Sequence, residues 1–109
     1  MKRTRAYSRT TNEVARLLGS RVRLGRIDRH WSAQELANRV GVTRSTINKI
    51  EHGDPSVGLG VALEAAALVG APLFSEDDGL RRLELGRVSD RLALLPKRVR
   101  RPLMVNDAF

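Results

Sequence analysis

Residues 41–53, with the sequence GVTRSTINKIEHG, combine two apolar side chains at helical spacing with a row of polar ones. Ile47 and Ile50 lie three residues apart, as the core-facing side chains of a short helix do. No acidic residue occurs in this segment before Glu51. The other faces carry hydrogen-bond donors or mixed donors and acceptors, which are Arg44, Ser45, Thr46, Asn48 and Lys49. A rigid helix with such a surface suits recognition of a polyanion rather than covalent chemistry.

Each of these polar side chains suits more than one contact. The guanidinium of Arg44 matches guanine O6 and N7, and it matches a phosphate almost equally well. Ser45 can meet any base edge or a phosphate, and Asn48 can bind adenine or remain solvated. Lys49 is more often a phosphate ligand than a reader of bases. The sequence therefore predicts a surface for nucleic acid and leaves the partner of each side chain open.

Short-range signals predict the helix that precedes this segment. Ser32, followed three residues later by Glu35, is the pattern of a capping box at a helix start. Trp31 and Leu36 flank the cap as a hydrophobic staple does. Gly41 is expected to end this helix after roughly two turns.

A second short helix is expected directly after a tight turn. Thr43 should cap it, and it should span residues 44–52, where Gly53 stops it. Ala37 is small where the second helix crosses close above it, and Gly41 permits a turn with a positive φ. The apolar side chains that hold the two helices together are Leu36, Val40, Ile47 and Ile50. This is the spacing of a DNA-binding helix-turn-helix, whereas a plain helical hairpin, the alternative, does not explain the acid-free outer face.

The N-terminal part of the chain predicts a longer helix. Thr11 or Asn12 should cap it, and it should end at about Arg29. Gly19 and Gly25 either weaken this helix or let another helix approach closely. Its expected inner side consists of Val14, Leu18 and Val22.

The C-terminal part predicts two more helices, which makes the fold all-α. Ser56 should cap a helix that ends at Val69, and Pro72 can begin a further turn. The expected buried face of that helix is Leu59, Leu63, Ala66 and Ala67. A last helix over 78–94 should be capped by Ser75, Asp77 or Asp78. Its apolar side is Leu80, Leu83, Val88, Leu92 and Leu95.

The charge of the chain supports a polyanionic partner. The 109 residues carry a net charge of +8, with a sequence pI of about 11.4. The segment 20–56 has a net charge of +3 and the segment 57–95 a net charge of −2, so only the former suits a phosphate backbone. Arg21 and Arg23, on the first helix, are candidates to clamp that backbone.

Other classes of function lack the residues they need. The chain has no cysteine, and His30 and His52 are not at metal-ligand spacing, so no metal or cofactor is expected. No serine has the context of a nucleophile, which argues against an enzyme, and the acidic run SEDDG is expected to cap a helix. No apolar run approaches the roughly 20 residues of a membrane span. A cytoplasmic protein is expected.

One opposite-charge pair is expected inside the domain. Arg26 lies four residues after Val22, and Glu51 lies four residues after Ile47, so both should lean inward. Two half-buried opposite charges should pair, because either one left alone is costly. We expect an Arg26–Glu51 ion pair with a structural role.

Residues 20–74 resemble the phage-repressor/Cro-type (XRE) helix-turn-helix family, through SRVRLGRIDRHWSAQELANRVGVTRSTINKIEHGDPS. The resemblance implies a five-helix domain that binds a near-palindromic operator in double-stranded DNA as a homodimer. In this family the preceding helix often begins with a glutamine that touches a phosphate. Ala33 takes that place in this chain, and Gln34 follows it. The base contacts that the resemblance implies are Thr43, Arg44, Ser45, Asn48 and Lys49.

A narrower resemblance concerns three shorter segments. IEHGDPSVGLG, LPKRVR and NDAF are similar to segments of the HipB-like antitoxins, which are encoded beside HipA-like serine/threonine kinases. This implies a type II toxin–antitoxin protein that represses its own operon and binds a kinase toxin. The alternative is a stand-alone regulator without a toxin partner.

The expected organisation has four parts. A basic disordered arm over 1–10 precedes a helix-turn-helix domain over 11–74. A C-terminal helix over 75–95 should provide a dimer or partner surface, and 96–109 should form an extended tail. A domain this small has more apolar side chains than it can bury alone, which favours a homodimer through Leu59, Leu63, Leu92 and Leu95.

Overall fold

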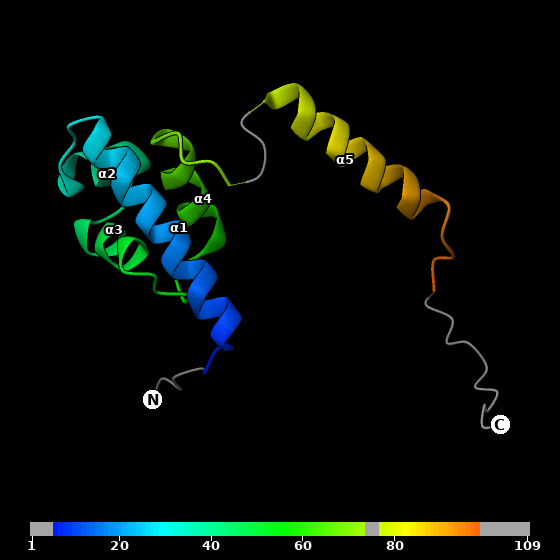
Figure 1. Ribbon diagram of the computed structural model, residues 1–109, viewed down its shortest axis with the longest axis horizontal. Coiled ribbons are helices and arrows are strands. Elements are labelled where there is room, and N and C mark those ends of the chain that lie inside the picture. Colours follow the sequence, from blue (N-terminus) through cyan, green and yellow to red (C-terminus); the bar gives the residue numbers. More distant parts are fainter. Residues whose placement is uncertain (1–5, 74–76, 99–109) are drawn as a thin grey trace. The chain divides into compact units, whose positions relative to one another are not determined.

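The computed structural model describes residues 6–73 and 77–98, and these ranges hold five α-helices and no strand (Figure 1). The helices are α1 (Arg9–Asp28), α2 (Ala33–Val40), α3 (Arg44–Glu51), α4 (Leu59–Leu68) and α5 (Asp78–Ala93). The prediction of an all-α fold with five helices is confirmed. The chain forms two compact units, of which the first ends at Glu76 and contains α1 to α4. The second unit begins at Asp77 and contains α5.

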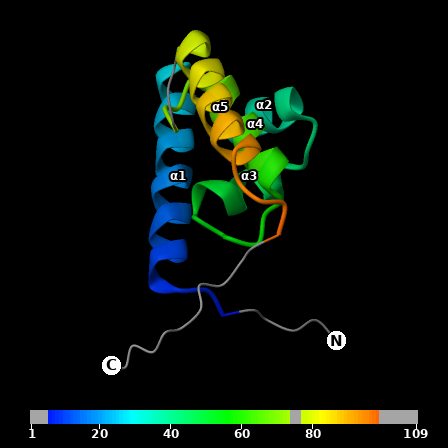
Figure 2. The same cartoon turned by 90° about the vertical axis from the view of Figure 1, so that its right-hand side faces the viewer.

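The first unit is built around one small apolar core. α1 packs against α3 and α4, and α2 packs against the same two helices. Figure 2 shows α1 standing along one side of the other three helices. All four helices contribute to the core, and Trp31 packs at its edge. The core residues are Val22, Leu36, Ala37, Ile47, Ile50, Ala65, Ala66 and Val69.

Local hydrogen bonds set the ends of α2 and α3. The Ser32 hydroxyl accepts the Glu35 N–H, and the Glu35 carboxylate accepts the Ser32 N–H, each at 3.0 Å. The hydrogen bond from the Ser32 N–H, followed by that from the Ser32 side chain, holds the pKa of the Glu35 carboxylate below its usual value. α2 ends at Gly41, which has a φ of 87°, a conformation that favours glycine. The Thr43 hydroxyl then accepts the Thr46 N–H at 3.2 Å and starts α3.

α1 begins before the position that the sequence predicts. Ser8 caps it, because the Ser8 hydroxyl accepts the Thr11 N–H at 3.1 Å. Thr11 and Asn12 therefore lie inside the helix rather than at its cap. Residues 9 and 10 of the basic arm expected over 1–10 are therefore helical, and its residues 1–5 lie outside the described part of the chain.

The inner side of α1 starts later than predicted. Val22 is fully buried and Leu18 packs against the core, but Val14 is 60% exposed because the core packing of α1 begins at Leu18. Gly19, between Leu18 and Val22, lets α3 pack closely against α1, because a Cβ atom at Gly19 would lie 2.1 Å from the carbonyl oxygen of Ile50. Of the two roles that the sequence left open for Gly19, close approach is therefore the one observed.

The start of α4 also differs from the prediction. Ser56 does not cap the helix, because its N–H and its hydroxyl both donate to the Asp54 carboxylate, at 2.8 and 2.6 Å. The same bonds hold the pKa of Asp54 below its usual value. Gly58 stands at the N-cap without a side-chain hydrogen bond, so α4 begins at Leu59.

Small side chains form the buried face of α4. The predicted face is wrong for Leu59 and Leu63, which are 73% and 38% exposed, and for Ala67, which is also exposed. The cause is the closeness of α1, since a Cβ atom at Gly25 would lie 2.6 Å from the Val69 carbonyl oxygen. At such a distance the packed face needs small residues. Those that α4 buries are Ala62, Ala65 and Ala66.

α5 is described by itself as the helix of the second unit. The Asp77 carboxylate caps it by accepting the N–H of Gly79 at 2.7 Å and of Leu80 at 3.2 Å. None of its side chains is buried. The predicted tail over 96–109 lies outside the described residues from position 99 onward. The turn predicted from Pro72 runs into residues 74–76, which also lie outside them. No helix in the described ranges has the length and apolar character needed to cross a membrane.

Candidate nucleic-acid interface

α3 is buried along one side and open along the other. Ile47 and Ile50 anchor its inner side in the core. Its exposed side chains are Arg44, Ser45, Asn48 and Lys49. Within the described part of the chain, these four side chains form no hydrogen bond to another group, so their donors are available to a ligand from outside.

Two threonines at the start of α3 are less available. The Thr43 hydroxyl accepts the Thr46 N–H, and the two hydroxyl oxygens lie 3.1 Å apart. Thr46 is also half-buried. The Thr43 hydroxyl is thus engaged in capping α3, and the Thr46 hydroxyl is hydrogen-bonded to it.

An ion pair between Arg26 and Glu51 ties the C-terminal end of α3 to α1. Arg26 Nε and Nη2 donate to the two carboxylate oxygens of Glu51, at 2.6 and 2.9 Å. The side chains are only 14% and 6% exposed. Arg26 Nη1 also donates to the Trp31 carbonyl oxygen at 2.9 Å. The hydrogen bond from Glu51 raises the pKa of Arg26 above its ordinary value.

The segment from α2 to α3 therefore consists of two short helices joined by a tight turn, the second with its polar side exposed. Residues 22–73 match the family model described as helix-turn-helix. The segment is thus similar to helix-turn-helix domains of the XRE type, which are the DNA-binding part of transcription regulators. The chain matches no curated protein and no solved structure.

The match leaves out the first part of α1 and all of α5. Both are helical in this protein. Two helical segments thus lie outside the part of the chain that matches the family model.

The structure separates the two arginines that the sequence singled out on α1. Arg21 Nη1 donates to the Pro72 carbonyl oxygen at 2.9 Å, which ties it to the segment after α4. Arg23 is exposed and, among the described residues, has no such bond. The sequence missed Arg16, whose side-chain stem passes over Gly53: a Cβ atom there would lie 2.6 Å from Arg16 Cγ. No local pattern indicates this contact, because it joins α1 to the turn after α3.

At the start of α2, the exposed polar side chain is Gln34 rather than residue 33. Ala33 is half-buried and packs against the core, so position 33 offers no polar group to a ligand. Gln34 is exposed, and its Nε2 donates to Asn38 Oδ1 at 2.9 Å. That bond leaves the oxygen of Gln34 and the amide nitrogen of Asn38 on the surface.

The two histidines lie in different surroundings. His52 caps the end of α3, and its Nδ1 donates to the Asn48 carbonyl oxygen at 2.7 Å. His30 has a φ of 57° in the turn after α1. In the described ranges, no group of three or more potential ligands could hold a metal ion.

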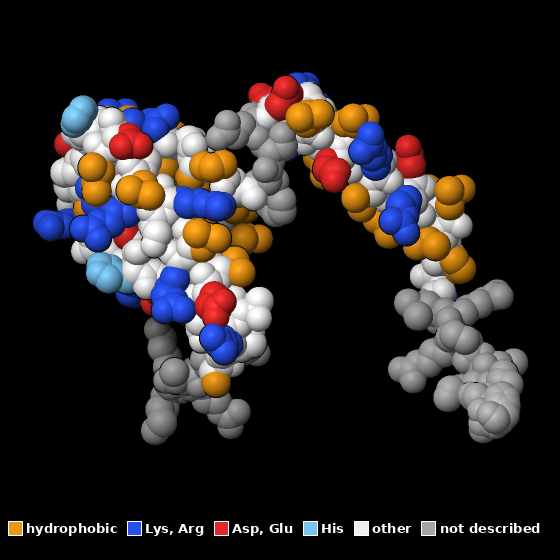
Figure 3. Space-filling view, viewed as in Figure 1, with side chains coloured by type: hydrophobic (Ala, Val, Ile, Leu, Met, Phe, Trp, Pro, Cys, Tyr) orange, Lys and Arg blue, Asp and Glu red, His pale blue; other side chains and the backbone are white. Residues whose placement is uncertain are grey.

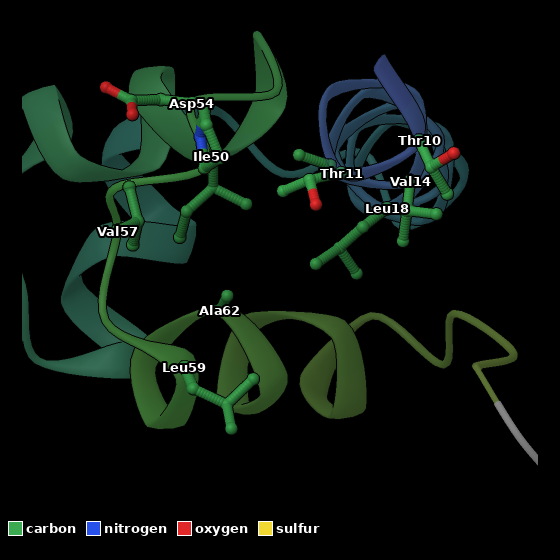
Figure 4. Close-up of a pocket in the computed structure, with 11 residues that line it drawn as sticks. Thr10, Thr11, Val14, Leu18, Ile50, Asp54, Val57, Leu59 and Ala62 are labelled. Carbon is green, nitrogen blue, oxygen red and sulfur yellow. The ribbon is translucent and has the colours of Figure 1, made fainter. Parts of the chain in front are cut away.

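A groove of about 390 Å³ lies between the start of α1, the loop before α4, and α4 itself (Figure 4). Its polar side chains are Thr10, Thr11 and Asp54, the last of which is bound by Ser56. The remaining walls are apolar and hold no lysine or arginine. In Figure 3, by contrast, lysine and arginine side chains gather over α1 and α3. The groove is thus unsuited to nucleic acid, whereas the α3 side suits it.

Proposed function

We propose that this protein is a sequence-specific transcriptional repressor that places α3 in the major groove of double-stranded DNA. The observation that carries the proposal is the outer side of α3, with four exposed polar side chains that have no bond to the rest of the described chain. The buried side of α3 and the Arg26–Glu51 pair hold these donors at fixed positions. Fixed donors are what recognition of base edges requires.

The position of each side chain on α3 suggests its role. Arg44 and Ser45 stand in the first turn and would meet base edges, while Asn48 follows one turn later. Lys49 would contact a phosphate. Further contacts at the edge of the interface would come from Thr43, which caps α3, from Thr46, and from Gln34 at the start of α2.

Replacing Arg44 with alanine tests this orientation of α3. The side chain is exposed and unbonded, so the substitution should leave the free energy of unfolding unchanged. Loss of a bidentate contact to a base should cost about 1–3 kcal/mol of binding and relax the preference at one base pair. A gel-shift or anisotropy titration on the protein's own promoter region and on single-base variants of it measures both quantities. Unaltered affinity and specificity would show that α3 is oriented differently.

Arg16 and Arg23 are proposed as phosphate contacts on α1 in preference to Arg21, whose guanidinium is bound to the Pro72 carbonyl. Arg16→Ala should weaken binding to all sequences and reduce the salt slope of log Kobs by about one. Arg21→Ala is the matched comparison and should lower thermal stability with little change in the salt slope. The opposite assignment of the two effects would show that Arg21, and not Arg16, faces the DNA.

We also propose that the protein acts as a homodimer on a near-palindromic operator and is the antitoxin of a HipBA-like module. In that role it would repress its own operon and bind a HipA-like serine/threonine kinase. Support comes from the resemblance of residues 50–60 and of the C-terminal segments to such antitoxins. A stand-alone regulator without a toxin partner is the second candidate, which the helix-turn-helix match supports equally.

The two candidates differ in their genetic surroundings and in their partners. A kinase-like reading frame directly downstream, together with co-purification of its product with the full chain, is the result expected for an antitoxin. Truncation before Pro96 would then show whether the tail is required for that complex. Absence of any neighbouring kinase gene would leave the stand-alone repressor as the function.

A further inference from the structure

His52 closes α3 and lies on the same side of the helix as the proposed DNA contacts. It follows Ser45 by seven residues and Asn48 by four, and side chains at these spacings share one face of a helix. The side chains of all three residues are exposed. The exposed outer side of α3 therefore continues to the end of the helix, one turn beyond Asn48.

One hydrogen bond determines how the imidazole of His52 can meet a ligand. Its Nδ1 lies 2.7 Å from the Asn48 carbonyl oxygen, and a carbonyl oxygen can only accept, so Nδ1 carries a proton. Among the described residues, Nε2 of this exposed side chain has no hydrogen-bond partner. In the neutral ring Nε2 is therefore a bare acceptor, and it becomes a donor only when the ring is protonated.

The position of His52 along α3 favours a contact with the DNA backbone. Seven residues of α-helix advance about 10 Å along the helix axis. The major groove is about 12 Å wide. With Ser45 over the base edges, His52 would reach the edge of the groove, where the phosphates lie. Phosphate oxygens only accept hydrogen bonds, so they bind the protonated imidazole and not the neutral one.

We propose that His52 binds a DNA phosphate through its protonated Nε2, so that the complex becomes tighter as the pH falls. The inference rests on the proposed function, because it requires α3 to lie in the major groove. Binding takes up one proton from solvent at Nε2, and the resulting N–H donates to a phosphate oxygen. A cation at the C-terminal end of α3 also interacts favourably with the helix dipole, which otherwise opposes an anion there.

The charged groups near His52 leave the role of counter-ion to the phosphate. Glu51, the preceding residue, is engaged in its ion pair with α1. The Asp54 carboxylate, in the following loop, is hydrogen-bonded within that loop. Lys49 from α3 and Arg16, which reaches the turn after α3 from α1, add positive charge. No carboxylate in the described ranges pairs with the imidazole, so a DNA phosphate would supply the charge that favours its protonated form.

The composition of the chain limits the groups that can make DNA affinity depend on pH. The chain has two histidines and no cysteine. Side chains of ordinary titration range therefore change charge between about pH 6 and 8 only at these two residues, beside the α-amino group. A pH dependence of affinity in this interval thus has few sources, which single substitutions can separate.

Anisotropy titrations of the full chain on its own promoter fragment, at constant ionic strength and several pH values, test the proposal. The wild-type affinity should rise about tenfold between pH 8 and pH 6, because one charge-assisted hydrogen bond is gained. His52→Ala should bind as the wild type does at pH 8 and show no rise toward pH 6. His52→Lys, whose cation does not titrate in this range, should bind tightly at both pH values.

His30→Asn is the matched control, because His30 is also exposed but lies in the turn after α1. Asparagine tolerates the φ of 57° at this position, and the variant should keep the pH dependence of the wild type. Removing the imidazole of His52 leaves the end of α3 intact, since the His52 backbone N–H still donates to the Asn48 carbonyl oxygen at 3.0 Å. Thermal unfolding of each variant checks that it is folded.

Three results would overturn the contact and leave the proposed action of α3 standing. These are specific binding that does not change with pH, a pH dependence that persists in His52→Ala, and equal loss of the pH dependence in both histidine variants. Absence of specific binding by the wild type at every pH would refute the proposed function, and the His52 contact with it.

Discussion

Gly19→Ala should destabilise the first unit by about 3 kcal/mol or more, although alanine is the better helix former. The new Cβ atom would lie 2.1 Å from the carbonyl oxygen of Ile50 and 3.0 Å from the backbone of Glu51. These atoms belong to the backbone of α3, so no side-chain rotation can relieve the overlap. α3 must move away from α1, which opens the core around Val22 and Ile50.

Chemical denaturation of the full chain, followed by circular dichroism, measures this loss. Gly60→Ala is the matched control, because Gly60 is also helical and a Cβ atom at that position would have no neighbour within 4 Å. It should raise the free energy of unfolding by about 0.5–1 kcal/mol through helix propensity alone. Equal stability of the Gly19→Ala variant and the wild type would mean that α1 and α3 are not in close contact.

Arg26→Leu should cost about 3–5 kcal/mol of stability, because it leaves a carboxylate with a side chain only 6% exposed without its partner. The Trp31 carbonyl oxygen loses its guanidinium donor as well. Because Glu51 is the last residue of α3, DNA affinity should fall together with stability. Urea titration of the variant and its DNA affinity at low temperature are the two measurements.

The double variant Arg26→Leu/Glu51→Leu separates two contributions to the loss of stability. One is the loss of the ion pair itself, and the other is the cost of leaving the buried Glu51 carboxylate without a partner. Buried ion pairs are often replaced by apolar pairs at little cost, so the double variant should recover much of the stability lost in Arg26→Leu. A double variant that is less stable than Arg26→Leu would contradict this account. A single variant as stable as the wild type would show that the pair contributes nothing.

The sequence predicted α2, the turn and α3 almost residue by residue. Their ends depend on contacts between residues three apart, such as Ser32 with Glu35 and Thr43 with Thr46. Such contacts form wherever the chain is helical and do not depend on the rest of the molecule. The Arg26–Glu51 pair joins different helices, but it could be predicted because each residue lies one turn after a buried apolar one.

The prediction at Ser56 failed through a local competitor, because its N–H and hydroxyl both bind the carboxylate of Asp54, two residues earlier. The prediction for α4 failed because a distant segment decides which of its side chains are buried. Leu59 and Leu63 look like core residues, yet the buried face of α4 consists of alanines because α1 comes so close at Gly25. The helix propensity or hydrophobicity of a residue does not reveal how closely a neighbouring helix packs against it.

The sequence by itself determined that the fold is all-α, that residues 33–51 form two short helices around a glycine turn, and that the outer side of the second helix carries no acid before Glu51. Those properties follow from side-chain types at fixed local spacing. Only the tertiary structure decided the contacts of the arginines on α1. The guanidinium of Arg21 donates to the Pro72 carbonyl oxygen, whereas the side-chain stem of Arg16 packs over Gly53. The tertiary structure also decided that α5 buries nothing in its unit. The physical reason is that packing depends on distances between elements far apart in the chain, and no local pattern encodes them.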